Sequence, residues 1–168
     1  MFKILTINTT RSLIAFFLLL STMPLTSANE TSRNWQSEML AKVNKIRIDN
    51  GVPSLRICKS LGLAAQRYSE YMAKENFLSH TGKDGSSLGD RLIKAGFRWK
   101  NSNSYIGENI AAGQQSVREV LSGWLNSPPH YRNIVNKNFT HVGFGKATST
   151  SSKYGVYWVQ NFGSGVKC

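Results

Sequence analysis

The chain has 168 residues, enough for one domain with a sizeable core and too short for two domains of ordinary size. Hydrophobic residues make up 40% of the chain and charged residues 18%, a composition that excludes a disordered or fibrous protein. The net charge of +12 favours loose association with anionic surfaces and says nothing about fold or catalysis. Two cysteines are too few for a disulfide-scaffolded miniprotein or a zinc finger.

The N-terminal segment has the pattern of a secretory signal peptide. It carries Lys3 and Arg11 without any acidic residue, then the apolar run 13–20, then small residues at 26–28. The run is about half as long as the roughly 20 residues that cross a bilayer as a helix, and a retained anchor is the alternative. We predict that residues 1–28 are removed and that the protein is secreted or lies in the periplasm or cell envelope.

Both cysteines belong to the mature part of the chain. Export would place Cys58 and Cys168 in an oxidising compartment, where they can form a disulfide bond. A free buried Cys58 with an unpaired Cys168 is the alternative. Neither cysteine lies in a nucleophile motif.

Apolar residues recur at helical spacing in four segments, which predicts four amphipathic helices. They cover residues 34–48, 60–76 and 87–95, and a fourth begins after Ser116 and ends before Pro128. Ser60 is the expected N-cap of the second helix. The third helix is expected to stop at Gly96.

Three segments with the period of a strand accompany these helices, at 104–110, 142–145 and 154–162. The last of them is apolar on both faces, since Trp158 and Tyr157 project in opposite directions. A strand of this kind is covered on both sides. The sequence therefore predicts a layered α-β-α arrangement, formed by a single domain at 29–168 without repeats or linkers.

Three residues are candidates for chemistry. His80 follows the second helix, His130 follows the fourth, and Glu108 is a charged residue in an otherwise apolar strand. A carboxylate in that position is costly unless it is paired or reaches a cleft. Two imidazoles and one carboxylate suit a zinc-like ion with an open position. A hydrogen-bonded structural network is the alternative, because the chain has no local metal signature such as HExxH.

Other catalytic and binding motifs are missing from the sequence. Ser79 and Ser127 lie near histidines, but neither is in a Gly-x-Ser-x-Gly elbow. Asp84-Gly85 and Asp90-Arg91 are interpreted as turn and helix-start residues. Lys and Arg are scattered, so specific binding of nucleic acid is not expected despite the charge.

Six stretches of the chain together resemble the CAP superfamily, also called SCP-like, which holds cysteine-rich secretory, antigen 5 and pathogenesis-related proteins. The likeness is to its compact bacterial branch and runs from about residue 36 to 163. The stretches occur in the family's order: FLSH at 77–80, DGS at 84–86 with DRL at 90–92, GENI at 107–110, WLNSPPHYRNI at 124–134, VGFG at 142–145 and YWVQNF at 157–162.

The resemblance implies an α+β fold, a three-layer α-β-α sandwich with a small central antiparallel sheet. It also implies an open cavity lined by two histidines and two acidic residues. His80, Glu108 and His130 carry over onto this chain, whereas Ser127 stands where the second acidic residue is expected. That departure removes one negative charge from the cation-binding set. His141 has no counterpart in the cavity and is expected at the edge of a strand.

The function that the resemblance implies is binding. We expect a secreted, monomeric CAP-domain protein whose cleft at His80, Glu108, His130 and Ser127 takes a lipid or sterol, a divalent cation or an envelope ligand. No cofactor is required, although a divalent cation such as zinc fits the three side chains with nitrogen and carboxylate donors. The alternative is a metal-assisted hydrolase in which His80 and His130 hold the ion and Glu108 is a ligand or general base. A third interpretation is a basic structural protein docked on an anionic envelope polymer.

Overall fold

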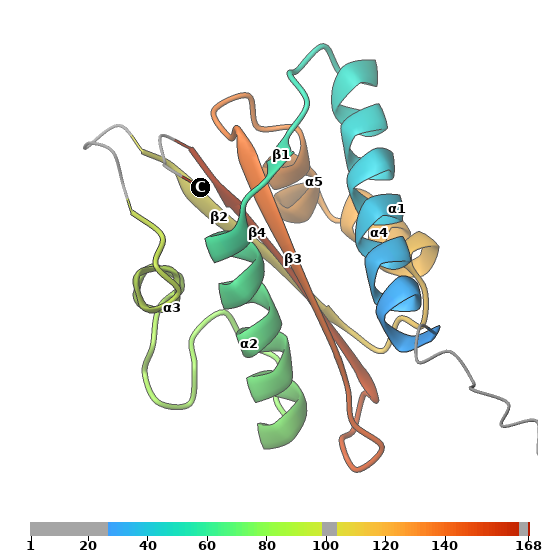
Figure 1. Cartoon of the computed structure of the whole chain (residues 1–168), viewed down its shortest axis with the longest axis vertical. Coiled ribbons are helices and arrows are strands. Elements are labelled where there is room, and N and C mark those ends of the chain that lie inside the picture. Colours follow the sequence, from blue (N-terminus) through green and yellow to red (C-terminus); the bar gives the residue numbers. More distant parts are fainter. Residues whose placement is uncertain (1–26, 99–103, 165–167) are drawn as a thin grey trace, which may run out of the picture.

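A four-stranded sheet lies between two layers of helices in the computed structural model (Figure 1). The structure describes residues 27–98, 104–164 and 168, with side chains from Trp35 onward. The predicted signal segment up to residue 26 lies outside the described residues. The elements follow in the order α1 (Ser27–Asp49), β1 (Arg56–Ile57), α2 (Lys59–Glu75), α3 (Leu88–Lys94), β2 (Ile106–Ala112), α4 (Val117–Leu125), α5 (Pro128–Ile134), β3 (His141–Thr148) and β4 (Val156–Gly163).

The sheet has the strand order β1-β3-β4-β2. Its three long strands are antiparallel, as expected, and β4 pairs with β3 on one side and β2 on the other. The two-residue strand β1 adds a parallel edge, in which Arg56 lies opposite His141, so the complete sheet is mixed. A strand of two residues has no periodicity, and the sequence did not predict it. His141 is the first residue of β3.

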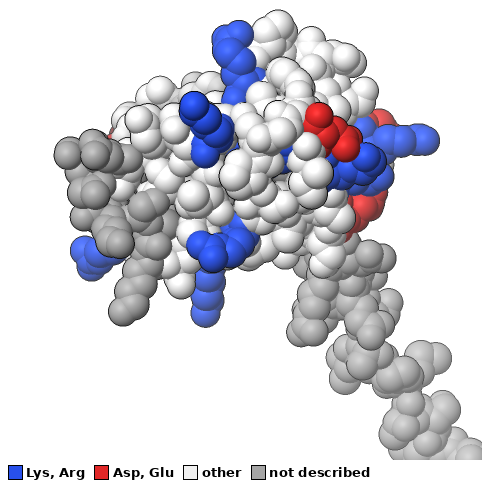
Figure 2. Space-filling view, turned by 90° about the horizontal axis from the view of Figure 1, so that it is seen from above, with Lys and Arg blue, Asp and Glu red and all other residues white. Residues whose placement is uncertain are grey.

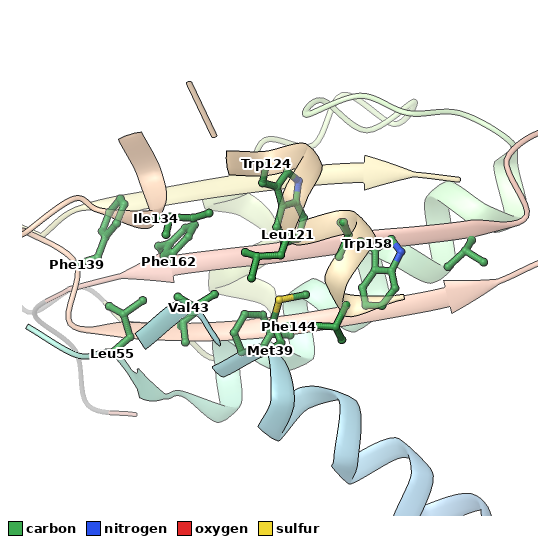
Figure 3. Close-up of a cluster of buried hydrophobic side chains, with 14 residues drawn as sticks. Met39, Val43, Leu55, Leu121, Trp124, Ile134, Phe139, Phe144, Trp158 and Phe162 are labelled. Carbon is green, nitrogen blue, oxygen red and sulfur yellow. The ribbon is translucent and has the colours of Figure 1, made fainter. Parts of the chain in front are cut away.

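Helices cover both faces of the sheet, and this confirms the predicted sandwich. On one face α1, α4 and α5 enclose the largest apolar cluster, which includes Met39, Trp124, Trp158 and Phe162 (Figure 3). On the other face α2 packs against Tyr157 and two smaller clusters form. All eight residues of β4 are buried, because each face of this strand is covered by helices. Among the described helices none is both long and apolar enough to span a membrane.

The helix α2 and the strand β3 pack so closely that their backbones are in contact. A Cβ on Gly143 would overlap the backbone of Leu61 and Gly62, and one on Gly145 would overlap the backbone of Ala65 and Gln66. Only glycine permits this contact. The two glycines of the 142–145 stretch therefore set how closely α2 lies on the sheet.

Several predicted boundaries were wrong: α1 begins at Ser27 and not at 34, β2 lies two residues later than predicted, and β3 is longer than the predicted 142–145. The N-cap of α2 is Cys58 and not Ser60, and its side chain makes no capping hydrogen bond because its sulfur is bonded to Cys168. The last strand begins two residues later than expected, because Gly155 has a φ of +72° and forms a turn before Val156. The helix α5 was also missed: the sequence predicts Pro128 only as a helix breaker, whereas in the fold Pro128 begins a new helix.

The two cysteines form a disulfide bond, so the alternative of free thiols is wrong. Cys58 and Cys168 have their Cα atoms 5.0 Å apart and are separated by 110 residues. The bond ties the C-terminus of the chain to the first turn of α2.

Candidate functional site

Glu108 is the centre of the candidate site. It lies in the middle of β2 with a side chain that is only 3% exposed. Its Oε1 is 2.8 Å from His80 Nδ1, and both carboxylate oxygens accept from Arg91 Nη2, at 3.1 and 3.0 Å. With its amide nitrogen facing the carboxylate, Asn161 donates to Oε2 at 3.3 Å. The buried charge that the sequence singled out is therefore paired, as a buried carboxylate must be.

Arg91 is the functional residue that sequence reasoning missed. Its side chain is 11% exposed and also donates to the backbone oxygens of His80 and Ser86. Its guanidinium lies 3.5 Å from the centre of the Tyr68 ring. The sequence placed Arg91 at a helix start, and its neighbour Asp90 does have that role in a capping box with Ser87. The only signal for Arg91 was its place in the DRL stretch of the resemblance.

His80 lies in the loop after α2, as expected, with a side chain that is 57% exposed. The loop is held by Tyr68, whose hydroxyl donates to the Ser79 carbonyl at 2.6 Å. Burial raises the pKa of Tyr68 to about 12, so this hydroxyl keeps its proton. Because Glu108 can only accept, His80 Nδ1 carries the hydrogen between them, and in the neutral ring Nε2 keeps the free lone pair.

His130 is the third residue of α5. Its Nδ1 is buried and has no hydrogen-bond partner among the described residues. Burial, and secondarily repulsion from His80, lower the pKa of His130, which favours its neutral form. The backbone oxygen of His130 accepts from Asn109, the residue next to Glu108 on β2. Ser127 is the N-cap residue of the same helix, and its side chain makes no capping hydrogen bond.

Two sets of polar contacts fix α5 against the rest of the fold. On one side Asn133 donates to the Glu108 carbonyl and to Asn109 Oδ1, at 3.2 and 2.8 Å. On the other, the fully buried Arg47 of α1 donates to the carbonyls of Ile134, Asn136, Phe139 and Pro53. These contacts hold the helix that carries His130.

The residues fit a metal ion only in part. The neutral His130 is the form of imidazole that ligates metals. Glu108, by contrast, already has both oxygens on Arg91 and one on His80, which does not fit a direct ligand. No group of three His, Cys, Asp or Glu side chains in the described part of the chain is arranged to hold an ion. The metal site thus stays a prediction.

The helix–sheet–helix sandwich, with a buried glutamate beside a histidine, agrees with the SCP-like architecture that the sequence resembles. The chain matches the CAP family, described as the cysteine-rich secretory protein family, over residues 40–162. The chain therefore belongs to this family.

Its similar proteins come from bacteria and from animals. It is 33% identical over 137 residues to the protein YkwD of Bacillus subtilis, covering 82% of this chain and 50% of YkwD. It is 31% identical over 119 residues to the human Golgi-associated plant pathogenesis-related protein 1, covering 70% of this chain and 62% of that protein. The chain thus spans less than two thirds of the length of either relative.

Solved structures show the same architecture. An extracellular protein of Bacillus anthracis that contains a SCP domain is 30% identical and superposes with a TM-score of 0.67, over 84% of this chain and 44% of that one. An outer surface protein of Borrelia burgdorferi is 21% identical with a TM-score of 0.68, over 79% of this chain and 94% of that one. The second likeness concerns the fold alone.

Proposed function

We propose that this protein is an extracellular binding module, with its ligand at the cleft formed by His80, Glu108, His130 and Ser127. The N-terminal pattern supports export after removal of residues 1–28. The similarity to the Bacillus anthracis protein, which is described as extracellular, supports the same location. The ligand is of a class that imidazoles recognise: the polar head of a lipid or sterol, a divalent cation such as zinc, or an envelope polymer.

The observation that carries this proposal is the hydrogen bonding of the Glu108 carboxylate. A general base needs a free carboxylate oxygen within reach of the proton it takes. Both oxygens of Glu108 instead accept hydrogen bonds from Arg91, and Oε1 also contacts His80. What the site offers to a ligand is therefore the exposed ring of His80 and the neutral ring of His130. Such groups can bind and orient the polar group of a ligand.

A metal-assisted hydrolase is the second candidate function. The unpartnered Nδ1 of His130 and its lowered pKa favour it, since a ligating imidazole must be neutral. A divalent ion held by His80 and His130 would supply Lewis acidity for hydrolysis. In this arrangement Glu108 and Arg91 would orient His80.

Isothermal titration of zinc into the chelator-treated protein separates these functions. His80→Ala and His130→Ala are compared with His141→Ala, a matched control because His141 starts β3 and lies outside the cleft. Micromolar binding that only the first two variants abolish would establish a metal site and justify a screen for hydrolysis. Zinc binding that is unchanged in both His80→Ala and His130→Ala would overturn the metal function. Titration with lipid and sterol vesicles, with the same variants, then tests the binding module.

A basic structural protein that docks on an anionic envelope polymer is the third candidate. The net charge supports it, since the full chain carries +12 and only Lys3 and Arg11 leave with residues 1–28. On the face seen in Figure 2, however, Lys and Arg do not form one continuous patch. Binding to teichoic acid or a comparable polyanion that falls steeply between low and physiological salt would support docking by charge.

A further inference from the structure

A pocket lies between α2, α3 and the turn at 82–86, next to the ion pair of Arg91 and Glu108. Its volume is about 280 Å³, which is near the lower end of small-molecule sites. From α2 it is lined by Arg67, Tyr68 and Tyr71, and from α3 by Asp90, Arg91 and Lys94. The helical spacing of 67, 68 and 71 places these three side chains on one face of α2.

The aromatic side chains of the pocket pack against one another. The rings of Tyr68 and Tyr71 have their centres 6.3 Å apart, and Tyr71 also packs edge-on against Phe77 at 5.3 Å. The guanidinium of Arg91 lies over the Tyr68 ring and donates a hydrogen bond to Glu108. Among the described residues, the Tyr71 hydroxyl has no hydrogen-bond partner. The pocket thus combines an aromatic surface with a hydroxyl that has no partner in the described part of the chain.

The acidic side chains of the pocket are committed to local structure. Asp90 Oδ2 accepts from the amide and the hydroxyl of Ser87, at 2.9 and 2.6 Å. Asp84 Oδ1 accepts from the amide of Ser86 at 3.1 Å. These hydrogen bonds lower the pKa of both carboxyl groups. Both carboxylates therefore stay ionised, and hydrogen bonds hold them in the turn and at the start of α3.

Two basic side chains of the pocket, by contrast, are not held by local hydrogen bonds within the described residues. Arg67 and Lys94 are exposed at the pocket, on α2 and α3 respectively. Neither forms a hydrogen bond or an ion pair with any residue that the structure describes, although Lys94 lies near enough to Asp84 to lower its pKa. Two uncommitted cations beside an aromatic surface select for a ligand that is both anionic and flat.

We propose that this pocket binds a small organic anion, a phosphate or carboxylate carried on a single ring, with the ring on Tyr71 and the anion between Arg67 and Lys94. This site goes beyond the proposed function, because none of His80, Glu108, Ser127 and His130 lines it, although Arg91 contacts both the pocket and Glu108. A pocket of about 280 Å³ has room for one ring and its anionic group and for little more.

The test is calorimetric titration of the full chain with four probes: phenyl phosphate, benzoate, benzylamine and inorganic phosphate. Phenyl phosphate or benzoate is expected to bind, and whichever binds more tightly identifies the anion. Arg67→Ala/Lys94→Ala is expected to weaken that binding at least tenfold. Arg118→Ala/Lys137→Ala is the matched control, since it removes the same two charges from α4 and from the loop before β3, and it is expected to change the affinity less than twofold.

Four results would overturn the proposal. If neither phenyl phosphate nor benzoate binds, the site is excluded. Tighter binding of benzylamine would show that the pocket selects cations. Inorganic phosphate that binds as tightly as phenyl phosphate would remove the role of the ring. An equal loss in both double variants would show that only the net charge matters. Tyr71→Ala gives an independent check of the ring contact, with an expected loss of at least threefold for phenyl phosphate and no change for zinc.

Discussion

Arg91 of α3 and Glu108 of β2 form a nearly buried ion pair, in which Arg91 Nη2 lies 3.1 and 3.0 Å from the two carboxylate oxygens. The same guanidinium lies over the ring of Tyr68 and donates to the His80 carbonyl. The pair thus joins α2, α3, the His80 loop and β2 at one point. It holds the carboxylate that in turn orients His80.

Breaking this ion pair is expected to destabilise the fold. Arg91→Met leaves the Glu108 charge buried without its main partner, which should lower the free energy of unfolding by about 3–5 kcal/mol. Urea denaturation of Arg91→Met, Glu108→Gln and the double variant measures the coupling, expected at about 1–3 kcal/mol. Additive single effects would show that the two side chains do not stabilise each other.

Arg47 is expected to be as important as the ion pair, although it has no acidic partner among the described residues. It is fully buried and donates to four backbone carbonyls that lie six to 92 residues away in sequence. Hydrogen bonds to charged groups contribute about 1.5–3 kcal/mol each. Because Arg47→Met also removes the cost of burying the guanidinium, the variant should lower the free energy of unfolding by only about 3 kcal/mol.

Urea denaturation checks this expectation, with Lys45→Met as the control. Lys45 lies on the same helix and forms an exposed ion pair with Asp49, so its loss should cost less than about 0.5 kcal/mol. Similar values for the two variants would contradict the role assigned to Arg47. Hydrogen exchange should also show faster opening of α5 in Arg47→Met, because three of its four acceptors lie at or after the end of that helix.

The contact between α2 and β3 predicts opposite effects of the same substitution at different glycines. A methyl group at Gly143 or Gly145 would push into the backbone of α2, and each Gly→Ala variant should lose about 3 kcal/mol or more. Gly123 lies in α4, where a Cβ would meet nothing within 4 Å. Gly123→Ala should therefore stabilise the protein by about 0.4–1 kcal/mol. Thermal unfolding of the three variants tests this, and equal shifts would refute the close approach.

The environment of His130 predicts how stability depends on pH. Burial lowers the pKa of His130 in the folded state, so the unfolded chain binds more protons than the folded one. The contribution of His130 is then complete above the unfolded imidazole pKa of about 6.5 and is lost as the pH falls through the acidic range below it. His130→Gln should accordingly weaken the loss of stability on acidification.

Proton NMR titration of the imidazole rings gives the direct measurement. His130 and His141 should both titrate below about 6.5, since burial lowers the pKa of each. A His130 that titrates above this value would contradict the buried, neutral ring. In that case His130→Gln would leave the pH dependence of stability unchanged or make it steeper.

The sequence by itself determined the architecture. Helical spacing predicted α2, α3 and α4, and the two-sided apolar pattern of β4 predicted a sheet covered on both faces. A charged residue in an apolar strand also marked Glu108 as a site residue, because burial of an unpaired carboxylate is too costly. These features are encoded locally: side chains within one helix or strand reveal which faces are buried, whatever lies opposite.

Only the tertiary structure decided which groups meet. Arg91 is 17 residues from Glu108, and no sequence pattern near either residue predicts that the two pair. The two-residue strand β1 and the contacts of Arg47 join segments that are far apart in sequence in the same way. Pro128 stops one helix and starts the next, and only the contacts of Asn133 and Arg47 with β2 and the following loop position that new helix. Partners of this kind are set by packing of the whole chain, since a buried charge accepts whichever donor the assembled fold brings within reach.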